Sequence, residues 1–87
     1  MKSSTSPKFW RLYRKLPVEI REEARETYRL WLGNPRDPSM HFKKIRGVWS
    51  VRIGTTGHRA LASQEPDRYL WFWIGSHDEY ERILKDL

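Results

Sequence analysis

The sequence contains no cysteine, so no disulfide framework can hold the fold together. It has no apolar run of about 18 residues, the length that a membrane-spanning helix requires. Because Met1–Pro7 is polar, we expect no secretory signal there, and together these absences predict a cytoplasmic protein. A glycine-rich phosphate loop, a Ser/His/Asp order and metal-ligand spacings are missing as well, so we expect no metal and no cofactor.

Positive charge, in contrast, is plentiful and uneven. The 87 residues carry a formal net charge of +6, and arginine is more frequent than lysine. Basic residues outnumber acidic ones in residues 1–36 and 37–63, whereas acidic residues dominate residues 64–87. Arginine suits planar, bidentate contacts with phosphate. Charge therefore favours nucleic acid as the partner class, with an acidic protein second, although a solvated basic surface explains charge alone equally well.

The length suits one compact domain. We expect residues 1–7 to form a flexible N-terminus and residues 8–87 to form a single domain. A short helix is predicted at residues 8–15. A second helix is predicted at about residues 17–32, because apolar residues recur there at helical spacing between Pro17 and Gly33.

After residue 38 the apolar period changes from that of a helix to that of a strand. Strands are predicted at 41–46, 48–54, 58–63 and 69–74. Ser76 followed by Glu79 forms a capping box, so a last helix should begin at His77. The predicted fold class is α+β, with two N-terminal helices packed on a four-stranded antiparallel sheet and a short C-terminal helix.

Three residues stand out on this framework: Arg52, Arg59 and His77. The alternation puts Arg52 on the strand face opposite the apolar residues, and Arg59 begins the next strand, so the two arginines can be neighbours across a hairpin. Like charges side by side repel, and an anion between them relieves the repulsion. His77 at a helix start can hold a phosphate or move a proton. The alternatives are two surface arginines paired with carboxylates and a histidine that only decorates a helix start.

Four stretches, read in order, resemble the RelE/ParE superfamily of toxins from type II toxin–antitoxin systems, in particular its RelE/HigB/YafQ-like branch. They are Lys43-Lys44-Ile45-Arg46-Gly47, Val51-Arg52-Ile53-Gly54, His58-Arg59-Ala60-Leu61 and Phe72-Trp73-Ile74-Gly75-Ser76-His77-Asp78-Glu79-Tyr80. The likeness covers about residues 17–85. It implies the fold described above, an mRNA endoribonuclease that acts by attack of the 2′-hydroxyl on the scissile phosphate, and a cognate antitoxin, mRNA and the ribosome as partners.

The resemblance also implies roles for individual residues. Arg52 and Arg59 would stabilise charge on the phosphate, and His77 would protonate the leaving oxygen or act as base. Tyr80 is a further catalytic candidate, but its place in the apolar stripe of the last helix favours a core role. The residues implied to contact RNA are Lys43, Lys44, Arg46 and His58.

Departures from the family pattern keep other functions open. His58 stands where relatives usually have tyrosine, and Ser50 stands where some have a second basic residue. The late C-terminal tyrosine of the family is not clearly matched. The alternatives are a ParE-type inhibitor of DNA gyrase that cleaves nothing and a non-toxic RNA-binding domain of the same fold. No residue is assigned as the general base.

Overall fold

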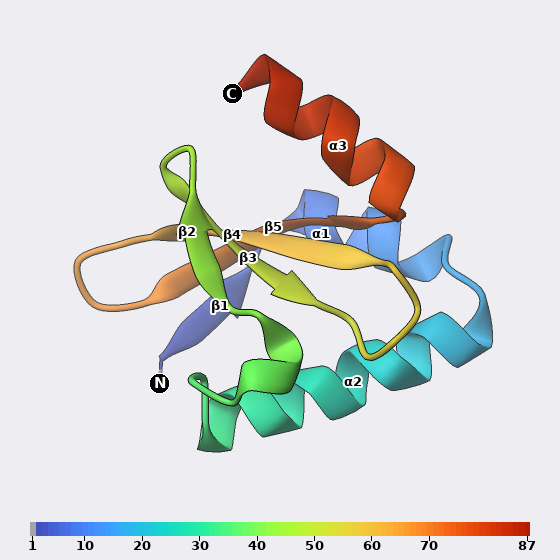
Figure 1. Cartoon of the computed structure of the whole chain (residues 1–87), viewed down its shortest axis with the longest axis horizontal. Coiled ribbons are helices and arrows are strands. Elements are labelled where there is room, and N and C mark those ends of the chain that lie inside the picture. The colour runs from blue at the N-terminus through green and yellow to red at the C-terminus, as the bar shows by residue number, and fades with distance from the viewer. Residues whose placement is uncertain (1) are drawn as a thin grey trace.

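The computed structural model describes residues 2–87, which form three helices, a short 3-10 helix and one five-stranded sheet (Figure 1). The elements in chain order are β1 (Ser3–Thr5), α1 (Pro7–Arg14), α2 (Val18–Gly33), η1 (Pro38–Met40), β2 (Lys43–Ile45), β3 (Val48–Arg52), β4 (Arg59–Gln64), β5 (Tyr69–Gly75) and α3 (His77–Asp86). No helix within residues 2–87 combines the length and the apolar character needed to cross a membrane.

The α+β class is confirmed, but the predicted four-stranded antiparallel sheet is wrong in one respect. The strand order is β1-β5-β4-β3-β2, and β1 runs parallel to β5, so the sheet is mixed and has five strands. The residues of β1 were expected to lie in a flexible terminus, because Ser3-Ser4-Thr5 is polar and has no apolar alternation. Pairing with the backbone of β5 forms this strand, and Met1 lies outside the described residues.

Local signals explain where the other elements begin and turn. The Ser6 side chain accepts a hydrogen bond from the backbone N–H of Phe9, so α1 begins at Pro7. Both halves of the predicted capping box are present at Ser76 and Glu79, and α3 begins at His77 as expected. Arg46 and Gly47 both have positive φ, which gives the tight two-residue turn between β2 and β3.

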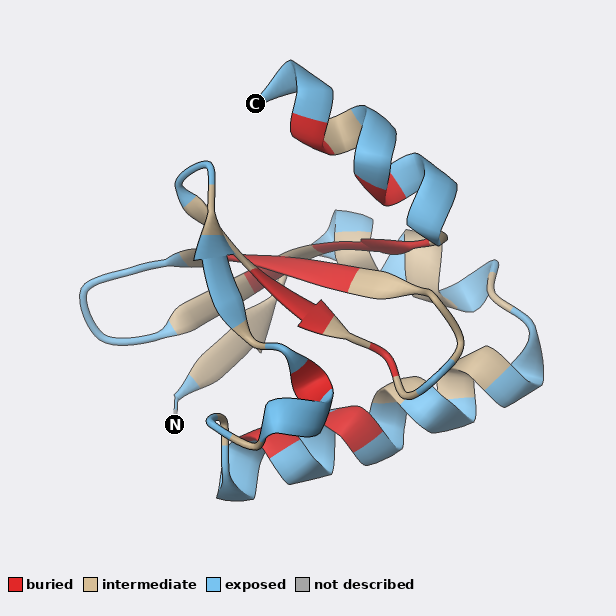
Figure 2. Ribbon diagram, in the orientation of Figure 1, coloured by how far each residue is buried: buried red, intermediate tan, exposed pale blue. Residues whose placement is uncertain are grey.

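Helices cover both faces of the sheet, and the buried residues gather in its centre (Figure 2). On one face, Trp31 of α2 and the apolar side of α1 pack on Val51, Ala60 and Trp71. On the other face, Tyr80 and Leu84 of α3 pack on Leu61 and Trp73. Figure 1 shows α2 and α3 on opposite sides of the strands. We call the face covered by the helical hairpin of α1 and α2 the hairpin face, and the face covered by α3 the α3 face.

Candidate functional site

Strand register brings Arg52 and Arg59 together on the α3 face. The two residues are direct partners across β3 and β4, and their side chains share the face of Ser50 and Leu61. Both arginines are partly exposed. Within residues 2–87, no carboxylate oxygen lies within ion-pair distance of either guanidinium. Arg52 and Arg59 are therefore neighbours, as expected. Within the described residues neither is paired with a carboxylate, which was the alternative.

Arg59 is held in place from two directions. Its Nη1 donates to the backbone oxygens of Gly57, at 2.9 Å, and His58, at 3.2 Å. Its guanidinium carbon lies 5.5 Å from the centre of the Tyr80 ring, within cation–π range. Burial lowers the pKa of Arg59 below its ordinary value, and the charge of Arg52 lowers this pKa further. This guanidinium is thus preorganised beside a second cation.

Arg52 makes a different contact. Its Nη1 lies 3.2 Å from Nε2 of His41, an exposed residue that ends η1. His41 has φ 47° and ψ 44°, in the left-handed region. His41 was expected to be the first residue of a strand, so its approach to Arg52 was not predicted. The structure begins β2 at Lys43 and uses His41 for the turn out of η1.

His77 is the first residue of α3 and is about half exposed. Its Nε2 lies 3.4 Å from Oε1 of Glu81, one helical turn later. Its ring is 6.3 Å from the Tyr80 ring, the same ring that supports Arg59. The loop between β3 and β4 also reaches His77, because a Cβ placed on Gly57 would lie 3.9 Å from the His77 Cβ. His77 and Arg59 therefore occupy one neighbourhood centred on Tyr80.

Tyr80 itself is in the core. Its side chain is 5% exposed, and its hydroxyl accepts a hydrogen bond from Ser50 Oγ at 3.2 Å. The ring packs with Leu61, Trp73 and Leu84. Tyr80 therefore occupies the core position that its place in the apolar stripe favoured. Its ring supports Arg59 and His77.

The sequence-derived RNA contacts divide between the two faces. Lys43 pairs with Ser50 and so lies on the α3 face, whereas Lys44 pairs with Trp49, which packs on the hairpin face. Arg46 extends to α3 and donates to the carbonyl oxygen of Leu84 at 2.6 Å. His58 immediately precedes β4, and its backbone oxygen accepts a hydrogen bond from Arg59.

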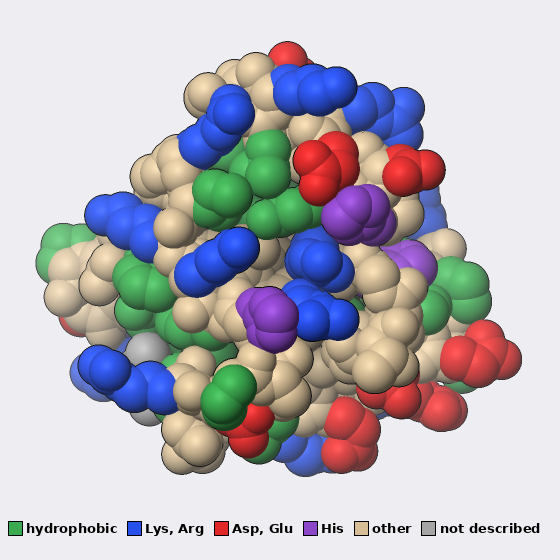
Figure 3. Space-filling model, in the orientation of Figure 1, with side chains coloured by type: hydrophobic (Ala, Val, Ile, Leu, Met, Phe, Trp, Pro, Cys, Tyr) green, Lys and Arg blue, Asp and Glu red, His purple; other side chains and the backbone are tan. Residues whose placement is uncertain are grey.

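Glu81 is a member of the site that sequence reasoning missed. Its charge raises the pKa of Arg59, a smaller influence than burial and Arg52, and its carboxylate contacts His77. The spacing of four residues between His77 and Glu81 on a predicted helix was the available signal. Figure 3 shows the resulting surface, with basic and histidine side chains gathered over the strands and acidic side chains beside them near α3. Residues 2–87 contain no cluster of histidine and acidic side chains suited to a metal ion.

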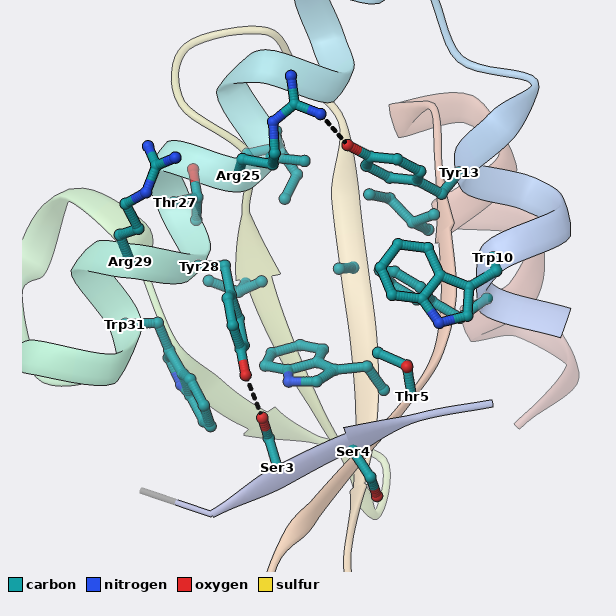
Figure 4. A pocket seen from close by; sticks show the side chains of 17 residues that line it. Ser3, Ser4, Thr5, Trp10, Tyr13, Arg25, Thr27, Tyr28, Arg29 and Trp31 are labelled. Atoms are coloured by element: carbon teal, nitrogen blue, oxygen red, sulfur yellow. Dashed lines mark hydrogen bonds between the residues drawn. The ribbon is translucent and has the colours of Figure 1, made fainter. Parts of the chain in front are cut away.

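A second feature lies on the hairpin face. A cavity of about 550 Å³ opens between β1, α1, α2 and the sheet (Figure 4). Its walls are mostly aromatic and aliphatic and include the exposed side chains of Trp10 and Tyr28 and the buried side chain of Trp31. Arg25 also lines it and donates to the Tyr13 hydroxyl at 3.0 Å. The hydroxyls of Ser3 and Tyr28 are 2.6 Å apart and join β1 to α2 across the cavity.

Comparison with solved structures identifies the fold. The chain superposes on RelE in the RelB–RelE antitoxin–toxin complex of Methanococcus jannaschii with a TM-score of 0.70, at 12% identity over 91% of this chain and 95% of that chain. The isolated E. coli RelE toxin gives 0.64 at 15% identity, over 99% and 98%. The RelBE2 toxin–antitoxin complex of Mycobacterium tuberculosis gives 0.59 at 17% identity, over 86% and 88%. No protein-family profile and no curated protein sequence matches the chain. The chain has a RelE/ParE-like toxin fold.

Proposed function

We propose that this protein is the toxin of a type II toxin–antitoxin pair and that it is an endoribonuclease acting on mRNA at the ribosome, in the cytoplasm. The observation that carries the proposal is the Arg52–Arg59 pair, two neighbouring guanidiniums without a carboxylate partner within residues 2–87, beside His77 on one face of the sheet. Such a pair is electrostatically unfavourable alone and favourable around a phosphate. The RelE-like fold supports the same assignment, and residues 3–87, with β1 in the sheet, act as one toxin domain.

In this mechanism the ribose 2′-hydroxyl attacks the adjacent phosphorus. Arg59, held over the Tyr80 ring, and Arg52 stabilise the negative charge that accumulates on the phosphorane oxygens. His77 protonates the leaving 5′-oxygen. Glu81, whose carboxylate lies 3.4 Å from Nε2 of His77, orients the imidazole. Lys43, on the same face, binds the backbone of the RNA.

The antitoxin is the expected protein partner, as in the structures titled as RelB–RelE complexes. Two features of the chain suit a segment that is both acidic and apolar. The cationic surface of the α3 face attracts carboxylates, and the aromatic cavity on the hairpin face accepts apolar side chains beside Arg25. One wrapped segment that reaches both would cover the nuclease site and anchor on the opposite side of the sheet.

The test is inducible expression in bacteria, with the 5′ ends of cellular mRNA mapped after induction. Wild type should arrest growth and generate new 5′ ends, and Arg59→Ala should do neither. Arg68→Ala is the matched control, because Arg68 is exposed and paired with Asp67 in the loop beyond the other end of β4. Its new ends should equal those of wild type.

Growth arrest by wild type without new mRNA ends would overturn the nuclease assignment. Inhibition of gyrase supercoiling by the purified protein in that case would favour the ParE-type alternative. Absence of both growth arrest and cleavage, with folded protein present, would favour the non-toxic RNA-binding alternative.

A further inference from the structure

The reaction proposed above lacks a group that removes the 2′ proton, and the contact between Arg52 and His41 bears on that gap. A guanidinium only donates hydrogen bonds, so His41 Nε2 must accept in the 3.2 Å contact with Arg52 Nη1. An accepting Nε2 means a neutral imidazole whose proton is on Nδ1. The unprotonated nitrogen of His41 is therefore directed at one of the two arginines of the proposed phosphate site.

The position of His41 is fixed by its own turn. The residue adopts the left-handed conformation, which residues other than glycine seldom occupy and which is concentrated at functional sites. Met40, immediately before it, is 2% exposed and anchors the turn in the core. At the start of the turn, Asp37 accepts hydrogen bonds from the N–H and the hydroxyl of Ser39. A capped and anchored turn thus presents the imidazole to Arg52.

We infer that His41 is the general base of this reaction and that phosphate binding by Arg52 releases it. The inference rests on the proposed nuclease function. In the free protein, an N–H of Arg52 occupies the lone pair of His41 Nε2. When the scissile phosphate takes the hydrogen bonds of that guanidinium, Nε2 becomes available. The base is thus unmasked only where a phosphate is bound.

The proton balance then closes. His41 Nε2 takes the proton of the 2′-hydroxyl as the O2′–P bond forms. The P–O5′ bond breaks, and His77 gives its proton to O5′. The products are a 2′,3′-cyclic phosphate and a 5′-hydroxyl, with His41 protonated and His77 neutral, and exchange with water restores both.

Charged groups on the elements next to His41 enter any pH profile. They are Arg52 on β3, Arg59 on β4, Lys43 on β2 and Asp37 at the start of η1. Of these, Asp37 accepts hydrogen bonds from Ser39, which lower its pKa.

The test uses an mRNA with sulfur in place of the bridging 5′-oxygen at the scissile linkage, assayed free and bound to the ribosome. A sulfur leaving group departs without protonation, so His77→Ala should recover to near the wild-type rate on this substrate. His41→Ala should remain slower than wild type by roughly 10²–10⁴-fold on both substrates. His41→Asn, which tolerates the left-handed conformation and still accepts a hydrogen bond, should be equally slow.

Each outcome bears on a separate claim. Wild type that cleaves neither substrate would overturn the nuclease proposal. Active wild type with an equally active His41→Ala variant would overturn only the role of His41. An active His41→Asn variant would show that the residue merely positions Arg52. Independently of turnover, nitrogen NMR of the free protein should show the His41 proton on Nδ1, and 2′-O-methyl RNA should perturb Nε2. A proton on Nε2 in the free protein contradicts the inference.

Discussion

The two faces of the sheet are stabilised in different ways. On the hairpin face, Trp31 is 1% exposed and its ring contacts four other aromatic rings at centroid distances from 5.2 to 6.0 Å. On the α3 face, a smaller apolar cluster ends at Tyr80, and beyond it the surface holds like charges. Each aromatic pair contributes about 0.5–1.5 kcal/mol beyond burial, whereas a cross-strand like-charge pair costs roughly 0.2–1 kcal/mol. The hairpin face can therefore stabilise a fold whose α3 face holds an unfavourable pair of like charges.

The strongest test of this division is Trp31→Ala. Loss of this side chain leaves a cavity in the aromatic cluster, so the free energy of unfolding should fall by about 3–5 kcal/mol in urea titration. Leu32→Ala is the matched control, since Leu32 is the next residue and is 40% exposed. That variant should change stability by no more than about 0.5 kcal/mol. Equal losses in the two variants would contradict the division between faces.

The reverse pattern is expected for Arg52→Ala on the α3 face. RNA cleavage should fall by roughly 10²–10³-fold, because one of two donors to the phosphate is lost. Stability should stay the same or rise by a few tenths of a kcal/mol, roughly the range of a relieved cross-strand repulsion. Cleavage assays and urea titration on the same preparation measure both effects. A large loss of stability would show that Arg52 is structural.

Tyr80→Phe tests whether Tyr80 only supports Arg59 or takes part in the reaction itself. The ring beneath Arg59 remains, but the hydroxyl of Ser50 loses its partner in a buried place, at a cost of about 1–3 kcal/mol. Cleavage, measured where the variant is folded, should stay within a few-fold of wild type. Restoration of stability by adding Ser50→Ala would confirm the cause. A cleavage rate reduced by orders of magnitude would instead assign Tyr80 a direct catalytic role.

The smallest effect is expected at the start of α3. Ser76→Ala removes the cap and should reduce stability by about 1 kcal/mol.

Hydrogen bonds from the Ser76 backbone and hydroxyl lower the pKa of Glu79. Its folded-state pKa is thus below the unfolded value, so its contribution is present above the unfolded pKa and disappears as the pH falls through the folded pKa. Urea titrations from neutral to acid pH should show this loss in wild type and not in Glu79→Gln.

Much of the α3 face could be predicted because its signals are local. Strand alternation placed Arg52 and Arg59 on one face, and the capping box placed His77 at the helix start. The alternation on β2 separates Lys43, on the α3 face with the arginines, from Lys44, on the hairpin face. The contact of His41 with Arg52 was not predictable in this way, because a left-handed turn and the packing of η1 create it.

The hairpin face shows where local signals fail. The second helix was predicted within a residue or two, but nothing in Ser3-Ser4-Thr5 marks a strand. Its pairing depends on a parallel neighbour at the far end of the chain. Local signals did not predict the cavity either, because α1, α2, β1 and the sheet contribute its walls from separate segments.

The parallel pairing of β1 with β5 also affects the order in which the strands pair during folding. The hairpins β2–β3, β3–β4 and β4–β5 join neighbouring segments, whereas β1 must close a loop that contains most of the chain. Contacts so distant in sequence form late, because the entropy of closing the loop has to be overcome first. With only three polar residues in the sheet, β1 is also the strand expected to detach first in native-state hydrogen exchange. Since Ser3, Ser4 and Thr5 line the aromatic cavity, detachment of β1 would remove one of its walls.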